Sequence, residues 1–232
     1  MANTAPTNRL LAALPSFDRK QMIARCEPVQ MKAGELLYRV DEQIRFVYFP
    51  TGSFASLLAT TDRASGVEVA LIGSEGMLGM SCMLDVTTAP FKALVQGAGS
   101  AWRMERGEFQ RQVESRPVLA RRLARYLYVR MLDLGQMVTC TRFHLVEPRL
   151  ARWLLMTGDR AQSHHFLLTQ DLMALMLGVR RAGVTQAAGS LQQRGLISYR
   201  RGKIAIHDRR GLERVSCSCY ARALESYARH LG

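Results

Sequence analysis

The stretch 168–197 limits the fold of this chain more than any other part of its sequence. Thr169 is a good helix N-cap, and the apolar residues after it predict a short helix. The residues of that helix expected to face the core are Leu172, Leu175 and Met176. Gly178 follows directly, and a glycine there supplies the tight turn between two helices that cross steeply. The stretch is therefore predicted to form a helix-turn-helix.

A second helix is predicted between Gly178 and Gly195, because a glycine just past the last periodic residue commonly ends a helix. Its core-facing residues, at spacings of four and three, are Val184, Ala188 and Leu191. The residues left on its outer face are Arg180, Arg181, Gly183, Gln186 and Ser190. Arginine and glutamine bind guanine and adenine edges in the major groove, and arginine also binds phosphate. This face is predicted to bind DNA; the alternative is a solvated face with incidental arginines.

A basic hairpin is predicted directly after the second helix, over residues 197–206. Two short strands surround a tip that contains Arg201, and Gly202 provides the turn. Such a hairpin is a wing, and its tip is expected to contact phosphates. The complete set of candidate DNA-binding residues is Thr169, Gln170, Arg180, Arg181, Gly183, Thr185, Gln186, Ser190, Arg200, Arg201 and Lys203.

The charge of the chain is concentrated in the same region. The net charge is +13, and residues 148–232 carry +9 of it, with 14 Lys and Arg against five Asp and Glu. An excess of this size indicates a polyanionic partner, either nucleic acid or an anionic membrane, although it also occurs in merely basic proteins. No apolar run approaches the roughly 20 residues of a membrane helix, and no signal-type segment opens the chain. We therefore expect a cytoplasmic protein that binds double-stranded DNA and no membrane.

Upstream, residues 29–104 have the sequence pattern of a β domain. Short apolar runs alternate with glycine-containing turns, which is typical of a β sandwich or of a barrel such as a jelly roll. Residues 67–71 alternate with period two, and this pattern predicts a strand with Glu68 on its wetter face.

A long helix is predicted to follow this β domain, with Pro117 in its first turn. Its apolar seam is Leu127, Met131, Leu134 and Val138. The spacing of four and three is that of a coiled-coil dimer seam, or equally of a helix lying on its own domain. Glu147–Pro148 is a predicted junction, because the residue before a proline resists continuing a helix. The predicted domains are a sensor domain over 1–116, a dimerisation helix over 117–146 and a DNA-binding domain over 147–232.

These features together resemble the Crp/Fnr family of bacterial transcription regulators. The matching winged-helix residues, in order and at family spacing, are Thr169, Gly178, Arg181, Val184, Leu191 and 195–197. Segments 32–38 and 47–52 resemble the opening strands of that family's cyclic-nucleotide-binding-like β roll, and Gly73, Gly76 and Gly79 resemble its later turns. One departure is Ala182, where the family often has a glutamate that contacts cytosine, so a different operator is expected.

The resemblance implies an α+β fold with an N-terminal jelly-roll-like β roll, a long dimerisation helix and a C-terminal winged helix-turn-helix. It implies a homodimeric DNA-binding regulator rather than an enzyme, controlled by an effector or signal in the roll, with RNA polymerase as a further partner. No catalytic motif supports the rival reading, an enzyme or small-molecule binding module with an incidental basic tail.

The effector is not identified by the sequence. In cyclic-nucleotide binders of this family a glutamate binds the ribose and an arginine stretch binds the cyclic phosphate. Met80 and Phe91 stand at those places here, and Lys92 can only partly replace the bidentate arginine. These three residues are the candidate effector pocket, and cAMP and cGMP are not expected to bind well. The alternative is a constitutive DNA-binding protein whose roll is a ligand-free scaffold.

The cysteines predict neither a disulfide framework nor a metal site. They are odd in number and scattered: Cys26, Cys82, Cys140, Cys217 and Cys219. Reduced thiols are the expectation in a cytosol. Iron–sulfur members of the family cluster cysteines near the N-terminus, where this chain has only Cys26. Cys217 and Cys219 could bind a metal with Cys140 or form a redox pair, but two cysteines at this spacing are more often incidental.

Overall fold

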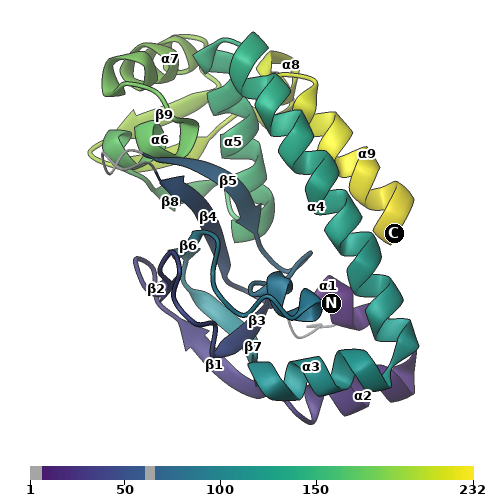
Figure 1. The fold of residues 1–232 in the computed structure, drawn as a ribbon. Helices are drawn as coiled ribbons and strands as arrows, with labels where there is room; N and C mark the ends of the chain where they lie inside the picture. The colour runs from purple at the N-terminus through teal and green to yellow at the C-terminus, as the bar shows by residue number, and fades with distance from the viewer. Residues whose placement is uncertain (1–6, 61–65) are drawn as a thin grey trace. The chain divides into compact units, whose positions relative to one another are not determined.

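The computed structural model of the chain describes residues 7–60 and 66–232. Within them the chain divides into two compact units (Figure 1). The first comprises residues up to 57 together with 71–130 and 230–232, and the second comprises 58–70 and 131–229. The prediction of an α+β fold is confirmed, since β sheets are followed by a long helix and by a helix-turn-helix with wing strands.

The first unit is the predicted β roll with short helices around it. Its helices are α1 (Arg9–Ala12), α2 (Ser16–Ile23), the 3-10 helix η1 (Met80–Leu84) and α3 (Arg106–Ser115). Its strands are β1 (Glu27–Met31), β2 (Leu36–Tyr38), β3 (Phe46–Pro50), β6 (Lys92–Gly97) and β7 (Gly99–Glu105). Strands β4 (Phe54–Thr60) and β5 (Gly66–Ile72) contribute residues to both units.

Two sheets make up the roll. One has the order β1-β7-β3 and is antiparallel, with Val29 opposite Ala101 and Val47 opposite Met104. The other has the order β2-β6-β4-β5. Strand β3 is buried at every residue from Val47 to Pro50, which explains why its sequence is a continuous apolar run rather than an alternation.

Glu68 does not lie where the alternation predicts. The strand is confirmed as β5, but Glu68 is only 2% exposed and accepts a hydrogen bond from the indole Nε1 of Trp153 at 3.0 Å. Both residues belong to the second unit. The prediction that Glu68 faces solvent is wrong, because an alternation of period two shows only that the two faces of the strand differ in polarity. It cannot show that a polar partner distant in sequence covers one of them.

The long helix is confirmed as α4 (Pro117–Phe143), which has 27 residues. Its seam is open to solvent on the single chain: Met131 is 62% exposed, Leu134 37% and Val138 71%, while Leu127 is half-buried. The helices that follow are α5 (Val146–Ala161), α6 (Gln170–Leu177), α7 (Arg181–Gln193), α8 (Arg209–Val215) and α9 (Cys219–Leu231).

The break between α4 and α5 lies just before the predicted junction at Glu147–Pro148. Helix α4 ends at Phe143 and α5 already begins at Val146, so Pro148 lies in the first turn of α5. Proline is tolerated there because the first amides of a helix have no intrahelical partner. The break between the two helices therefore lies before Glu147 and not after it. Among the described helices, none is long and apolar enough to cross a membrane.

Candidate nucleic-acid interface

Helix α6 and its turn have the predicted ends. The hydroxyl of Thr169 accepts a hydrogen bond from the backbone N–H of Leu172 at 3.1 Å, which satisfies one of the free amides of the first turn. Gly178 ends the helix at φ +61°, in the left-handed region that favours glycine.

The buried face of α6 differs from the prediction. The buried residues are Met173, Ala174, Met176 and Leu177, whereas Leu172 and Leu175 are not buried. Of the three predicted core positions, Met176 alone is buried. The reason is that residues 172–177 are all apolar, so no polar position marks which side of this helix meets the core.

Helix α7 presents a sharply divided surface. Val184, Ala188 and Leu191 are buried, as predicted, and Ala187 joins them. Gly195 follows the helix at φ +69°, as expected of a C-terminal glycine.

The candidate residues of α7 fall into two groups by exposure. Arg180 is the N-cap, and Arg181 is the first residue of the helix. The exposed candidates are Arg180, Arg181, Thr185 and Gln186. Ser190 and Gly183 are half-buried, and a Cβ placed on Gly183 would lie 3.8 Å from Val146 Cγ2. The side of α7 that bears Gly183 therefore faces α5, whereas the exposed candidates point away from it.

A polar network orients Arg181 before any ligand arrives. The Oε1 atom of Gln170 accepts hydrogen bonds from Arg181 Nε at 3.3 Å and from Thr185 Oγ1 at 2.9 Å. Asp171 lies 3.6 Å from Arg181, and the two side chains are 72% and 66% exposed. Exposed ion pairs contribute only about 0–1 kcal/mol, so Arg181 can exchange these partners for a base or a phosphate at little cost.

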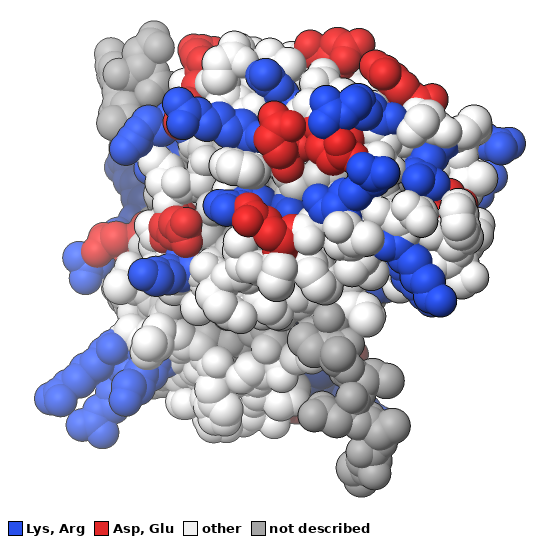
Figure 2. All heavy atoms as spheres, turned by 90° about the horizontal axis from the view of Figure 1, so that it is seen from below, with Lys and Arg blue, Asp and Glu red and all other residues white. Residues whose placement is uncertain are grey.

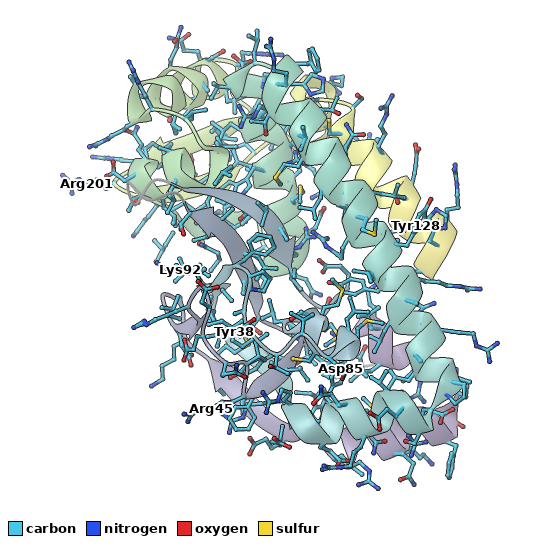
Figure 3. All side chains as sticks on the ribbon, viewed as in Figure 1. Tyr38, Arg45, Asp85, Lys92, Tyr128 and Arg201 are labelled. Carbon is cyan, nitrogen blue, oxygen red and sulfur yellow. The ribbon has the colours of Figure 1, made fainter. Side chains whose placement is uncertain are left out.

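The wing is confirmed as β9 (Ile197–Arg200) and β10 (Lys203–Ile206), which pair with Lys203 opposite Arg200. Arg201 and Gly202 form the turn at φ +50° and +78°, as a two-residue hairpin turn requires. Arg201 projects outward from the wing in Figure 3. A third strand, β8 (His165–Leu167), completes the sheet in the order β8-β10-β9. This strand was not predicted, since the sequence before it is polar and loop-like.

The basic residues of the wing also line a concave surface. A cavity of about 450 Å³ is lined by His165, Phe166, Leu167, Ser198, Arg200, Arg201, Lys203, Ile204 and Ala205. Arg200, Arg201 and Lys203 are exposed, while Ile204 is only 2% exposed. The cations of the wing are thus carried on a short strand pair whose other side is anchored in the core of the second unit.

Two arginines link the helix-turn-helix to α5, on the side away from the exposed face of α7. Arg149 is 8% exposed and donates a hydrogen bond to the carbonyl oxygen of Leu177 at the end of α6. Burial lowers the pKa of Arg149. Arg194 forms an ion pair with Glu147 at 3.0 Å, which ties the end of α7 to the start of α5. Sequence patterns did not find either brace, because the paired residues lie 28 and 47 positions apart.

The wing is held against α7 by a residue that the sequence analysis did not single out. The Oε1 atom of Gln192 accepts a hydrogen bond from the backbone N–H of Tyr199 at 2.8 Å. This hydrogen bond links the C-terminal part of α7 to the first strand of the wing.

One face of the molecule carries charges of both signs (Figure 2). Figure 2 shows a face on which acidic and basic side chains are interspersed. Ion pairs in the first unit, such as Arg25–Glu108 at 3.0 Å, are of this kind. The outer side of α7 and the wing tip differ, because five exposed arginine and lysine candidates lie there and Asp171 forms an ion pair with one of them, Arg181. The candidates are Arg180, Arg181, Arg200, Arg201 and Lys203.

The candidate effector residues lie at the starts of two elements of the roll. Met80 begins η1, Lys92 begins β6, and Phe91 directly precedes it. All three are half-buried. Gly79, just before Met80, has φ +82°, so the turn that resembles the family's later turns does require a glycine.

Comparison with known proteins matches part of the second unit to a family model. Residues 148–215 match the family model of the Crp-like helix-turn-helix domain. Comparison with curated protein sequences gives no match.

Solved structures share the fold of nearly the whole chain. A Crp/Fnr-family transcriptional regulator from Eubacterium rectale has a TM-score of 0.70 at 16% identity, over 89% of this chain and 96% of that one. A CRP/FNR-family regulator from Thermus thermophilus has a TM-score of 0.68 at 21% identity, over 82% and 98%. The c-di-GMP-responsive global regulator CLP from Xanthomonas campestris has a TM-score of 0.68 at 14% identity, over 83% and 99%.

Proposed function

From the Crp/Fnr fold of the chain and its Crp-like helix-turn-helix domain, we propose that this protein is a transcription regulator that binds double-stranded DNA through α7 and the wing. The observation that carries the proposal is the division of α7. One side is buried in the core, and the other begins with the exposed guanidinium of Arg181. In this motif the N-terminal end of the second helix enters the major groove.

The contacts are of two kinds. Arg181 and Gln186 read base edges from α7, because their donors and acceptors can match those of guanine and adenine. Arg200, Arg201 and Lys203 bind phosphates from the wing, which adds affinity without sequence information. Thr169 and Gln170 have a positioning role, since their side chains already bind the backbone of α6 and the first turn of α7.

The regulator is a homodimer paired through α4. An exposed seam of Met131, Leu134 and Val138 supports a second copy of the chain as its partner, because the same stripe on both copies is self-complementary. Two copies would present two recognition helices to two half-sites, which multiplies the affinity. The sensor, dimerisation and DNA-binding parts are proposed over 1–116, 117–146 and 147–232, and RNA polymerase is the proposed further partner.

An effector in the roll controls the dimer by shifting its population between two arrangements of the recognition helices. A related fold belongs to a c-di-GMP-responsive regulator, so this architecture can serve effectors other than cyclic mononucleotides. The rival proposal is a constitutive DNA-binding protein whose roll is a scaffold. It is favoured because Met80 and Phe91 stand where cyclic-nucleotide binders of the family have the glutamate and the arginine stretch.

Cyclic AMP is expected to bind this chain weakly or not at all. The reason is that Met80 and Phe91 offer no charge to the ribose and cyclic phosphate, and an uncompensated buried phosphate is costly. Isothermal titration of the purified chain with cAMP measures this directly. Affinity in the micromolar range would overturn the expectation, and Lys92→Ala would then show whether Lys92 holds the phosphate.

Selection of bound sites from random DNA duplexes tests the proposed function. The full chain is expected to enrich a two-fold symmetric sequence, with half-site centres about 10–10.5 base pairs apart or a multiple of this. Selection that returns no enriched sequence contradicts the proposal. Repeating the selection with cell extract distinguishes an effector-controlled regulator from a constitutive one. The extract should change the enrichment of bound sites by the first and leave the enrichment by the second unchanged.

A further inference from the structure

Four side chains of the types that bind transition metals meet in the second unit, beside the end of α4. Cys140 lies in α4 and His144 one turn later, while Cys217 and Cys219 lie between α8 and the start of α9. The three sulfur atoms and a ring nitrogen of His144 all lie within 4.8 Å of one another. This juxtaposition involves none of the residues assigned above to DNA, dimer or effector.

The distances within this group are those of ligands around one ion. Cys140 Sγ lies 3.6 Å from Cys217 Sγ, and Cys219 Sγ lies 3.5 Å from His144 Nδ1. In a tetrahedral zinc site, zinc–sulfur bonds are about 2.3 Å long and zinc–nitrogen bonds about 2.0–2.1 Å. Two sulfur ligands are then about 3.8 Å apart, and a sulfur and a nitrogen ligand are about 3.6 Å apart. The sulfur–sulfur distance is far longer than the roughly 2.05 Å of a disulfide.

The donor set selects the ion. Three thiolates and one imidazole form a soft tetrahedral set that suits Zn²⁺. An iron–sulfur cluster spreads its four ligands over two or four iron atoms, so some pairs of its ligand atoms would lie further apart than the 4.8 Å within which all four lie here. Cys140, Cys217 and Cys219 are 1%, 7% and 0% exposed, so all three sulfurs are withdrawn from solvent. Four protein ligands leave no position for water, which is the arrangement of a structural site rather than a catalytic one.

The neighbouring structure holds these ligands in place. The backbone N–H of His144 donates to the carbonyl of Cys140 at 3.1 Å, which continues the helical turn and puts both side chains on one face. The backbone N–H of Cys217 donates to the carbonyl of Pro148 at 3.3 Å. Gln136 Nε2 donates to Cys219 Sγ at 3.0 Å, a contact of the kind that orients metal-bound sulfur.

We propose that Cys140, His144, Cys217 and Cys219 bind one structural Zn²⁺, which fastens the start of α9 to the end of α4. The ion would cross-link segments that are 77 residues apart at Cys140 and Cys217. Metal binding to such a preformed site adds directly to the free energy of unfolding, since the unfolded chain does not assemble the four ligands. The site rests on these residues alone and does not depend on the proposed DNA binding.

The metal content of the purified full chain tests the proposal. Elemental analysis by mass spectrometry is expected to find about one Zn²⁺ per chain. Replacement by Co²⁺ should give the intense visible absorption of a tetrahedral cobalt–thiolate site. Cys217→Ser and His144→Ala should each lose the bound metal, whereas Cys26→Ser, a cysteine outside the group, should keep it.

Three results would overturn the proposal. The first is a reduced chain that contains no zinc and takes up neither added Zn²⁺ nor Co²⁺. The second is a Cys140–Cys217 disulfide as the stable form, detected by mass spectrometry of the unreduced chain. The third is stoichiometric iron in place of zinc. If the substituted chains fail to fold, the cobalt spectrum of the unmodified chain still decides between a tetrahedral thiolate site and none.

Discussion

Leu134→Lys is expected to convert the protein to a monomer and to abolish tight DNA binding. Leu134 is 37% exposed on the single chain, in the middle of the α4 seam. In a dimer a lysine there would bring two ammonium groups together in an apolar seam, where neither has a counter-ion. A monomer then has one recognition helix and loses the gain from binding two half-sites, which reaches about 10²–10⁴. Sedimentation equilibrium and a duplex titration measure both effects.

Thr139→Lys is the matched control, because Thr139 is also exposed on α4 but lies outside the seam. The control chain should remain a dimer and keep its DNA affinity. Circular dichroism should show equal helix content in both variants. A Leu134→Lys chain that sediments as a dimer would show that the seam is not the interface.

Arg181→Ala and Lys203→Ala are expected to weaken DNA binding in different ways. Arg181 begins α7 with its guanidinium exposed, and a guanidinium there can bind guanine O6 and N7 together, worth about 1–3 kcal/mol of discrimination. Its loss should relax the preference at one base pair per half-site. Lys203 is exposed on the wing and is the proposed phosphate contact there, so its loss should weaken binding to all sequences about equally and reduce the salt slope by roughly one per contact.

Both variants are best titrated against matched and mismatched duplexes at several salt concentrations. Asp171→Asn is an informative control, because it removes the ion pair with Arg181 but leaves the hydrogen bond to Gln170. It should leave base preference unchanged. If Arg181→Ala lowers affinity for every duplex by the same factor, Arg181 is a phosphate contact and the recognition face of α7 is assigned wrongly.

The fold could be predicted wherever the physical cause is local. Thr169, Gly178 and Gly195 determine the ends of two helices through capping and left-handed backbone, and all three lie as predicted. The core side of α7 was also predictable, since Val184 and Leu191 recur at helical spacing and polar residues lie between them. The same reasoning failed for α6, where an unbroken apolar run gives no such contrast.

Contacts between distant segments were not predictable. The hydrogen bond between Glu68 and Trp153 joins residues 85 positions apart, and no local pattern encodes it. The cysteine and histidine group is similar. Its two halves, Cys140 with His144 and Cys217 with Cys219, each have a metal-ligand spacing, but only the fold brings them together. The sequence analysis names Cys140, Cys217 and Cys219 as possible joint ligands, but it does not find His144 and cannot show that the four residues meet.

The central claim is that α7 reads base sequence, and the ratio of two affinities tests it most directly. The unmodified chain is titrated, at one near-physiological salt concentration, against its selected duplex and against a shuffled duplex of the same length and composition. A sequence-reading dimer should bind the selected duplex about 10³-fold more tightly or better. Equal affinity for the two duplexes would contradict the claim, because it would leave only the sequence-independent attraction between the basic surface and phosphate.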